Sequence, residues 1–122
     1  MKDIADIYSF QDKEESKYLL VIQYTIYIGL NDKMRKEQII DTSKAIQIVN
    51  SILLNYTSNF TVTQSEGYYR YKDSIQIKEN VLCYTIISFN SNDLYTFIKE
   101  VKVLLNQESI LVTSTCVFNH FY

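Results

Sequence analysis

The residues in this sequence best suited to chemistry form one short run of tyrosines around an arginine. The run Tyr68-Tyr69-Arg70-Tyr71 follows Glu66 closely, and Arg70 is one of two arginines in the chain. A planar guanidinium among phenol rings can stack on an aromatic ligand and bind a carboxylate or phosphate through paired hydrogen bonds. A solvated strand whose side chains pair across the sheet is the alternative. The predicted ligand-binding residues are Tyr27, Glu66, Tyr68, Tyr69, Arg70, Tyr71 and Gln107.

The chain has few of the residues that other kinds of catalytic or binding site require. Its two glycines are too far apart for a phosphate-binding loop. The single histidine, His120, follows Cys116 by four residues, which on a strand separates the two side chains by roughly 13 Å. We therefore expect no metal, no cofactor and no catalytic residue set. Cys83 and Cys116 lie in apolar runs and are predicted to be buried thiols in a reducing compartment.

Composition excludes several classes of protein. The chain has 122 residues, 47% of them hydrophobic, and its 12 basic residues face 14 acidic ones. These values fit one folded domain and argue against a disordered chain or a DNA-binding protein. No apolar run approaches the roughly 18 residues of a membrane span, and the N-terminal stretch lacks the apolar region of a secretory signal. We expect a cytoplasmic protein, and the Ile-, Lys- and Asn-rich composition is typical of an AT-rich bacterial or phage genome.

Hydrophobic periodicity predicts the secondary structure. Residues 1–17 are predicted to be an N-terminal arm and charged linker, and residues 18–122 a single domain. Alternating apolar residues predict a strand over 20–30, and helical spacing predicts helices over 45–56 and 94–105. Further strands are predicted at 60–63, 68–71, 81–89 and 110–118, with a bulge or bend at Gly67 between the first two.

This order of elements, β-α-β-β-α-β, predicts a ferredoxin-like α+β fold. Four antiparallel strands would form one sheet, with both helices on one face. The other face must meet water, a ligand or another copy of the chain. Because a small domain cannot bury many tyrosine hydroxyls, we expect an aromatic-rich open face that forms a homodimer or higher homo-oligomer. The aromatic residues on predicted strands are Tyr24, Tyr27, Tyr68, Tyr69, Tyr71, Tyr84 and Phe89.

Three segments resemble an uncharacterised bacterial and phage family of small domains. They are residues 24–30, ending in Gly29-Leu30, residues 60–69, ending in Gly67-Tyr68-Tyr69, and residues 106–111, with Gln107-Glu108-Ser109. They are similar to the family's fGL, GFTV…GxW and QESVL patterns, although Tyr69 stands where Trp is usual and Asn59 where Gly is usual. The resemblance implies a ferredoxin-like fold and names no activity. Gln107-Glu108-Ser109 is equally compatible with helix-capping and turn chemistry.

Three classes of function remain open from the sequence. We expect first a non-enzymatic, homo-oligomeric module that binds a small anionic or nucleotide-like ligand. A phage protein of this size could sequester a nucleotide-derived immune signal and so counter host defence. The alternatives are a dimeric α/β-barrel-type enzyme with a Tyr or Glu66 acid–base pocket, and a protein–protein interaction module that inhibits a host partner.

Overall fold

The computed structural model describes residues 18–70, 75–87 and 89–120 of the chain. The predicted arm and linker over 1–17, and the candidate Tyr71, lie outside these residues. The elements follow the predicted β-α-β-β-α-β order, which confirms the ferredoxin-like α+β fold. They are β1 (Tyr18–Gly29), α2 (Thr42–Leu53), β2 (Thr61–Arg70), β3 (Gln76–Ile87), α3 (Ser91–Leu104) and β4 (Leu111–His120).

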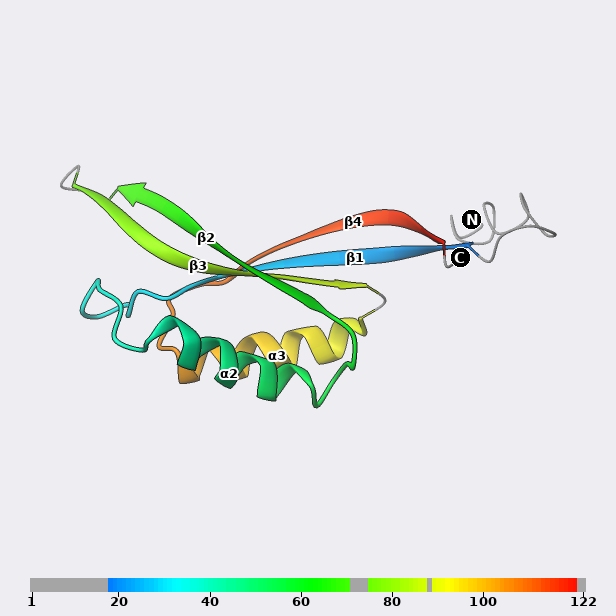
Figure 1. The fold of residues 1–122 in the computed structure, drawn as a ribbon, viewed down its shortest axis with the longest axis horizontal. Coiled ribbons are helices and arrows are strands. Elements are labelled where there is room, and N and C mark those ends of the chain that lie inside the picture. The colour runs from blue at the N-terminus through cyan, green and yellow to red at the C-terminus, as the bar shows by residue number, and fades with distance from the viewer. Residues whose placement is uncertain (1–17, 71–74, 88, 121–122) are drawn as a thin grey trace.

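The four strands form one antiparallel sheet in the order β2-β3-β1-β4. Both helices lie under the middle of the same face (Figure 1). The β2–β3 pair projects past the helices at one end of the molecule, and the β1–β4 pair projects past them at the other (Figure 1). Each pair therefore forms an arm whose strands are held mainly by their own hydrogen-bond ladder.

The core lies between the sheet and the helices. Ile26 and Ile28 of β1 and Leu82, Tyr84 and Ile86 of β3 have no exposed surface, as expected when alternate residues of central strands face a helix layer. The Tyr84 hydroxyl donates to Asn50 Oδ1 at 2.6 Å, so this deeply placed polar group is satisfied. Burial raises the pKa of the Tyr84 phenol.

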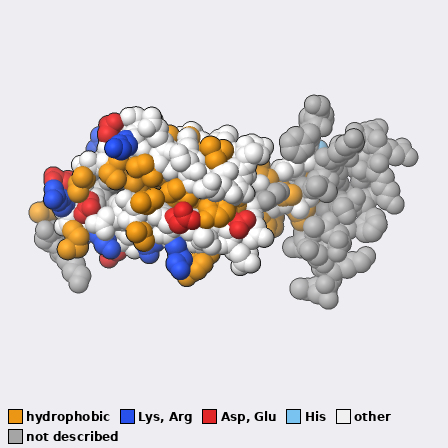
Figure 2. All heavy atoms as spheres, turned by 90° about the horizontal axis from the view of Figure 1, so that it is seen from below, with side chains coloured by type: hydrophobic (Ala, Val, Ile, Leu, Met, Phe, Trp, Pro, Cys, Tyr) orange, Lys and Arg blue, Asp and Glu red, His pale blue; other side chains and the backbone are white. Residues whose placement is uncertain are grey.

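Each helix buries one stripe of apolar side chains against the sheet, and its outer surface carries both apolar and charged side chains. Phe97 and Val101 of α3 are fully buried against the sheet. On the outer side, apolar and charged side chains lie among one another (Figure 2), and Leu54, Val103 and Leu104 are more than half exposed. Within the described residues, no helix lies on the second face of the sheet.

The turn after α3 has a defined geometry that matters for the site. Asn106 adopts a left-handed conformation with φ of 49°, which Asn tolerates better than most residues. The N–H of Asn106 donates to the carbonyl of residue 103, and that of Gln107 to the carbonyl of residue 102. This pair of hydrogen bonds is a Schellman motif. It ends the helix and turns Gln107 back toward the residues that follow β1.

The prediction of an aromatic-rich open face is wrong. Tyr24 and Tyr84 share the helix side with Ile26 and pack in or against the core, because side chains of like parity fall on one face. Of the predicted aromatic residues that the structure describes, only Tyr27 and Tyr69 have the parity of the open face. The rest of this face mixes apolar side chains with hydroxyl side chains. The hydroxyl side chains are Thr25, Thr61, Thr63, Ser65, Thr85, Thr113 and Thr115.

Three local predictions also need correction. Strand β2 runs through Gly67 in continuous register with β3, so it has no bulge there. Strand β3 begins at Gln76 rather than at residue 81, since its first residues lie on the β2–β3 arm and lack the apolar pattern of a buried strand. Cys116 is exposed and Cys83 partly so. Cys116 has helix-side parity with its partner Ile22, and Ile22 is exposed as well, so the core does not extend to this pair.

Candidate functional site

A polar pocket lies where β1 ends, between the β2–β3 arm and the turn that precedes β4. We call it the corner pocket. Its volume is about 270 Å³, close to the lower limit of roughly 300 Å³ for small-molecule sites. Three segments distant in sequence build it. The lining residues are Asn31, Asp32, Lys33, Lys36, Tyr69, Arg70, Glu79, Gln107, Glu108 and Ser109.

Two buried amide side chains form the inner wall of the corner pocket. Asn31 and Gln107 are 9% and 6% exposed, and among the described residues they are the buried polar ones. Gln107 Nε2 donates to the Asn31 carbonyl at 2.8 Å. Asn31 Nδ2 in turn donates to the Lys78 carbonyl at 3.3 Å and to the Tyr69 hydroxyl at 3.4 Å. These bonds satisfy the buried amides and connect all three segments of the pocket.

The Glu79 carboxylate lies against the end of β1, at a place that only glycine leaves open. Its Oε2 accepts the backbone N–H of Asn31 at 2.9 Å. A Cβ added at Gly29 would collide with all three atoms of that carboxyl group. Gly29 is therefore needed for a close approach between a side chain and a strand. The carboxylate is held by a backbone donor and is partly exposed in the pocket.

A tight loop carries the lysines of the corner pocket. Asp32 Oδ1 accepts the N–H groups of Met34 and Arg35 at 2.9 and 3.0 Å, while its Oδ2 accepts Asn106 Nδ2 at 2.8 Å. The hydrogen bond from Asn106, followed by that from the Arg35 backbone, holds the pKa of Asp32 below its usual value. The loop is thus tied to the turn after α3, which places Lys33 and Lys36 along the pocket.

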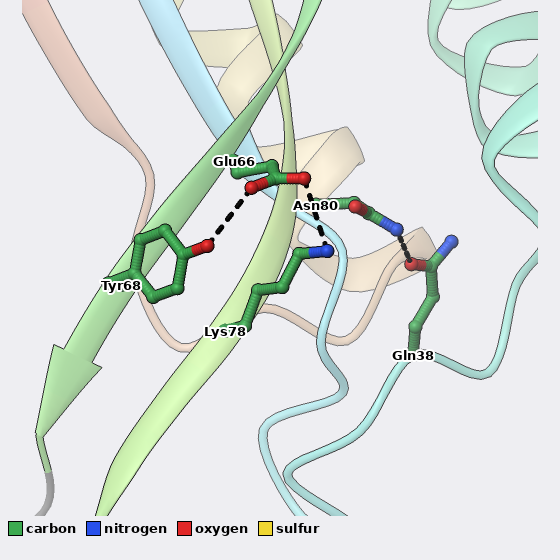
Figure 3. Close-up of polar contacts among 5 residues, drawn as sticks. All are labelled: Gln38, Glu66, Tyr68, Lys78 and Asn80. Carbon is green, nitrogen blue, oxygen red and sulfur yellow. Dashed lines mark hydrogen bonds and ion pairs between the residues drawn. The ribbon is translucent and has the colours of Figure 1, made fainter.

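A second polar cluster lies on the other side of the β2–β3 arm (Figure 3). Glu66 accepts the Tyr68 hydroxyl at 3.0 Å and forms an ion pair with Lys78 at 3.1 Å. Asn80 Nδ2 donates to Gln38 Oε1 at 2.7 Å. Lys78, with a smaller contribution from Tyr68, lowers the pKa of Glu66, and Glu66 raises the pKa of Tyr68. Glu66 and Lys78 are about half exposed, so the pair is a surface contact of small energetic weight.

The sequence-predicted site residues divide between these places. Tyr69, Arg70 and Gln107 line the corner pocket. Glu66 and Tyr68 lie in the second cluster, because their parity in β2 is opposite to that of Tyr69. Tyr27 lies on the open face, opposite Cys83 and Leu111, apart from both groups.

Sequence reasoning missed Asn31 and Glu79 as site residues. Glu79 fell outside the predicted strand, which was expected to start at residue 81. A signal was available in the pair Gly29 and Asn31, since a glycine and a polar residue at the end of a long apolar strand mark a close approach or a turn. Nothing local in the sequence pairs this strand end with Glu79 or with Gln107, which are 48 and 76 positions from Asn31.

Neither a metal-ligand cluster nor a membrane-spanning helix occurs within the described residues. No three His, Cys, Asp or Glu side chains there gather as metal ligands would. None of the helices within residues 18–70, 75–87 and 89–120 is long and apolar enough to cross a membrane.

The fold is similar to that of two kinds of solved structure. A phage SAM lyase in complex with S-methyl-5'-thioadenosine matches with a TM-score of 0.61 and 16% identity, over 83% of this chain and 88% of that chain. The apo state of a phage SAM lyase matches with a TM-score of 0.58 and 16% identity, over 84% and 89%. CutA from Synechococcus elongatus matches with a TM-score of 0.51 and 7% identity, over 84% and 85%. No protein-family model and no curated protein sequence matches the chain.

Proposed function

We propose that this protein binds S-adenosylmethionine (SAM) in the corner pocket and cleaves it to S-methyl-5'-thioadenosine, as a SAM lyase. The observation that carries the proposal is the arrangement at Asn31. One buried residue contacts both the Glu79 carboxylate and the Tyr69 hydroxyl at the wall of a polar pocket. The fold shared with a phage SAM lyase, which was solved with that thioether, supports the choice of ligand.

The charge balance of the pocket favours SAM over an anionic nucleotide. Three carboxylates, from Asp32, Glu79 and Glu108, face three cationic side chains, from Lys33, Lys36 and Arg70. SAM carries a sulfonium and an ammonium group, a carboxylate and a ribose diol, so it has partners for both signs. A pocket that binds a polyanionic immune signal would be expected to carry an excess of positive charge. Because of this charge balance, we now favour an enzyme that acts on SAM over the ligand-sequestering module that the sequence predicted.

Individual side chains suit different parts of SAM. Arg70 can bind the methionine carboxylate with its planar fork, and Tyr69, which is half-buried, offers a ring on which adenine can stack. Glu79 presents acceptor oxygens to the ribose hydroxyls or to the ammonium group. Because Glu79 and Tyr69 are already held by Asn31, little ordering is needed on binding.

The reaction needs no co-reactant. The bond between the sulfonium sulfur and Cγ of the methionine part breaks, and its electron pair stays on sulfur, which gives the neutral thioether. A carboxylate oxygen of the same methionine part bonds to Cγ, which gives homoserine lactone, so atoms and charge balance without any proton transfer. The pocket then has to hold the methionine part folded, with its carboxylate behind Cγ.

We further propose that the protein is a cytoplasmic homo-oligomer that uses its open sheet face. The open face carries the exposed side chains of Tyr27, Ile87 and Leu111, and the volume of the corner pocket is small for SAM if one chain acts alone. The exposed thiol of Cys116 suits a reducing compartment. Light scattering on the purified chain should give an integer multiple of 14.4 kDa greater than one.

A ligand panel tests the proposed function. Isothermal titration calorimetry with S-methyl-5'-thioadenosine, SAM, ATP and cyclic nucleotides should give binding for the first two compounds alone. Chromatography of the SAM sample should then show S-methyl-5'-thioadenosine accumulating. Binding of SAM without turnover would return the preference to a sequestering module. Binding of the nucleotides in place of SAM would overturn the proposal.

A further inference from the structure

Resting on the proposed function, we infer that Asn31 is a positioning residue that sets the ligand-binding orientation of Glu79 and Tyr69 together. Its backbone N–H holds Glu79 Oε2 at 2.9 Å, and its side-chain Nδ2 lies 3.4 Å from the Tyr69 hydroxyl. The two groups come from opposite strands of the β2–β3 arm, and β1 leads directly into Asn31. One residue at the end of a central strand thereby fixes two functional groups on an arm that the helices do not cover.

The burial of Asn31 and Gln107 is the first support for this inference. An amide in a largely apolar interior costs free energy unless every donor and acceptor is satisfied. Here Gln107 Nε2 donates hydrogen bonds to the Asn31 carbonyl at 2.8 Å and to the Leu105 carbonyl at 3.2 Å. Gln107 therefore holds Asn31 from behind, while the backbone N–H and side-chain Nδ2 of Asn31 contact Glu79 and Tyr69. Supporting hydrogen bonds of this kind keep the groups of a site in a fixed geometry.

Gly29 is the second support, because it reserves the space that Glu79 occupies. The atoms that an added Cβ would meet are the carboxyl carbon and both oxygens of Glu79, at the flexible end of that side chain. The substitution Gly29→Ala should therefore displace the carboxylate from the Asn31 N–H while leaving strand β1 in place. The other glycine of the chain, Gly67, provides a matched control, since a Cβ there would meet Val81 Cγ2 at 3.1 Å and not the carboxylate.

A merely structural network makes a different prediction from a positioning one. If Asn31 and Gln107 only stabilised the fold, Gly29→Ala and Glu79→Gln would change ligand affinity independently or leave it unchanged. If Gly29 acts through Glu79, its effect on affinity must disappear once Glu79 has lost its charge, whereas Gln107 acts through Asn31 on both Glu79 and Tyr69. A double-mutant cycle measures this difference.

The experiment measures the dissociation constant of S-methyl-5'-thioadenosine by calorimetry. Gly29→Ala and Gln107→Met should each weaken binding about tenfold, the loss expected for one hydrogen bond to a charged group. In the Glu79→Gln background, Gly29→Ala should change the constant less than about twofold. Gly67→Ala should bind like the wild type. Because Gln107→Met also removes hydrogen bonds from the helix turn, Gly29→Ala decides the outcome, and additive effects or wild-type affinity in that variant would overturn the inference.

A ligand-free readout separates failure of the inference from failure of the proposed function. The backbone amide of Asn31 can be followed by NMR hydrogen exchange in the free protein. Gly29→Ala and Glu79→Ala should both speed its exchange, because each removes the acceptor of this amide, and the double variant should add nothing further. If the wild type did not bind the thioether, the proposed function would fall and this readout would still decide the positioning role. Unchanged exchange in Gly29→Ala would overturn that role.

Discussion

The carboxylate of Glu79 accepts the backbone N–H of Asn31 at 2.9 Å, across 48 positions of sequence. This hydrogen bond joins the β2–β3 arm to the point where β1 leaves the sheet. It closes one side of the corner pocket and depends on the absence of a side chain at Gly29. The site is thus made by long-range contacts between segments, and each of these contacts can be tested separately.

Two adjacent tyrosines on β2 should respond differently to loss of their hydroxyl groups. Tyr69 lines the corner pocket and lies 3.4 Å from Asn31 Nδ2, whereas Tyr68 bonds to Glu66 in the second cluster. We expect Tyr69→Phe to weaken binding of S-methyl-5'-thioadenosine several-fold and Tyr68→Phe to leave it within about twofold. Calorimetry on both variants checks this. The reverse order of effects would place the ligand on the Glu66 side of the arm.

The Asp32 loop should contribute stability that acid removes. Because the hydrogen bonds from Asn106 and Arg35 lower the pKa of Asp32 in the folded state, its contribution is complete above the ordinary aspartate pKa of about 3.9. The contribution is lost as pH falls through the lowered folded value. Thermal midpoints of the wild type and Asp32→Asn should therefore differ at pH 7 and converge toward pH 3. A difference that stays constant over this range would show that the charge of Asp32 is not involved.

The packing between α3 and the sheet should dominate stability. Phe97 is fully buried, whereas Val103 on the same helix is 79% exposed. Phe97→Ala should destabilise the protein by about 3–5 kcal/mol, and Val103→Ala by no more than about 0.5 kcal/mol. Urea denaturation of both variants measures the difference. Similar losses in the two would mean that α3 is turned relative to its described position.

Periodicity predicted the core elements of the fold well and the arms poorly. Helix α3 was expected over 94–105 and occupies Ser91–Leu104. The prediction was accurate because the buried residues of this helix recur with a clear helical period in the sequence. The start of β3 at Gln76 was missed, since Lys78, Glu79 and Asn80 pair with β2 and contribute nothing to the apolar core. Ladder hydrogen bonds stabilise such a segment and leave little trace in its hydrophobic pattern.

The sequence alone could not predict which face of β1 packs against the helices or which residues form the wall of the corner pocket. Both faces of β1 are rich in apolar residues, so parity alone could not place Tyr24 on the helix side. The contact between Asn31 and Gln107 spans 76 positions and depends on the left-handed turn at Asn106. Tyr69 and Arg70 were singled out by the run of tyrosines around an arginine, and Gln107 by the resemblance of its segment to a family pattern; all three line the corner pocket. Asn31 and Glu79 are ordinary residues that gain their role by position.

The conversion of SAM by the wild type and by Glu79→Gln tests the central claim most directly. Purified protein is incubated with SAM at a concentration well below its KM, where the rate reports kcat/KM, and S-methyl-5'-thioadenosine and homoserine lactone are quantified by liquid chromatography and mass spectrometry. The account predicts equimolar products from the wild type and a rate about 100-fold lower in Glu79→Gln, with Glu66→Gln close to the wild type. No thioether from the wild type, or an unchanged rate in Glu79→Gln, would contradict it.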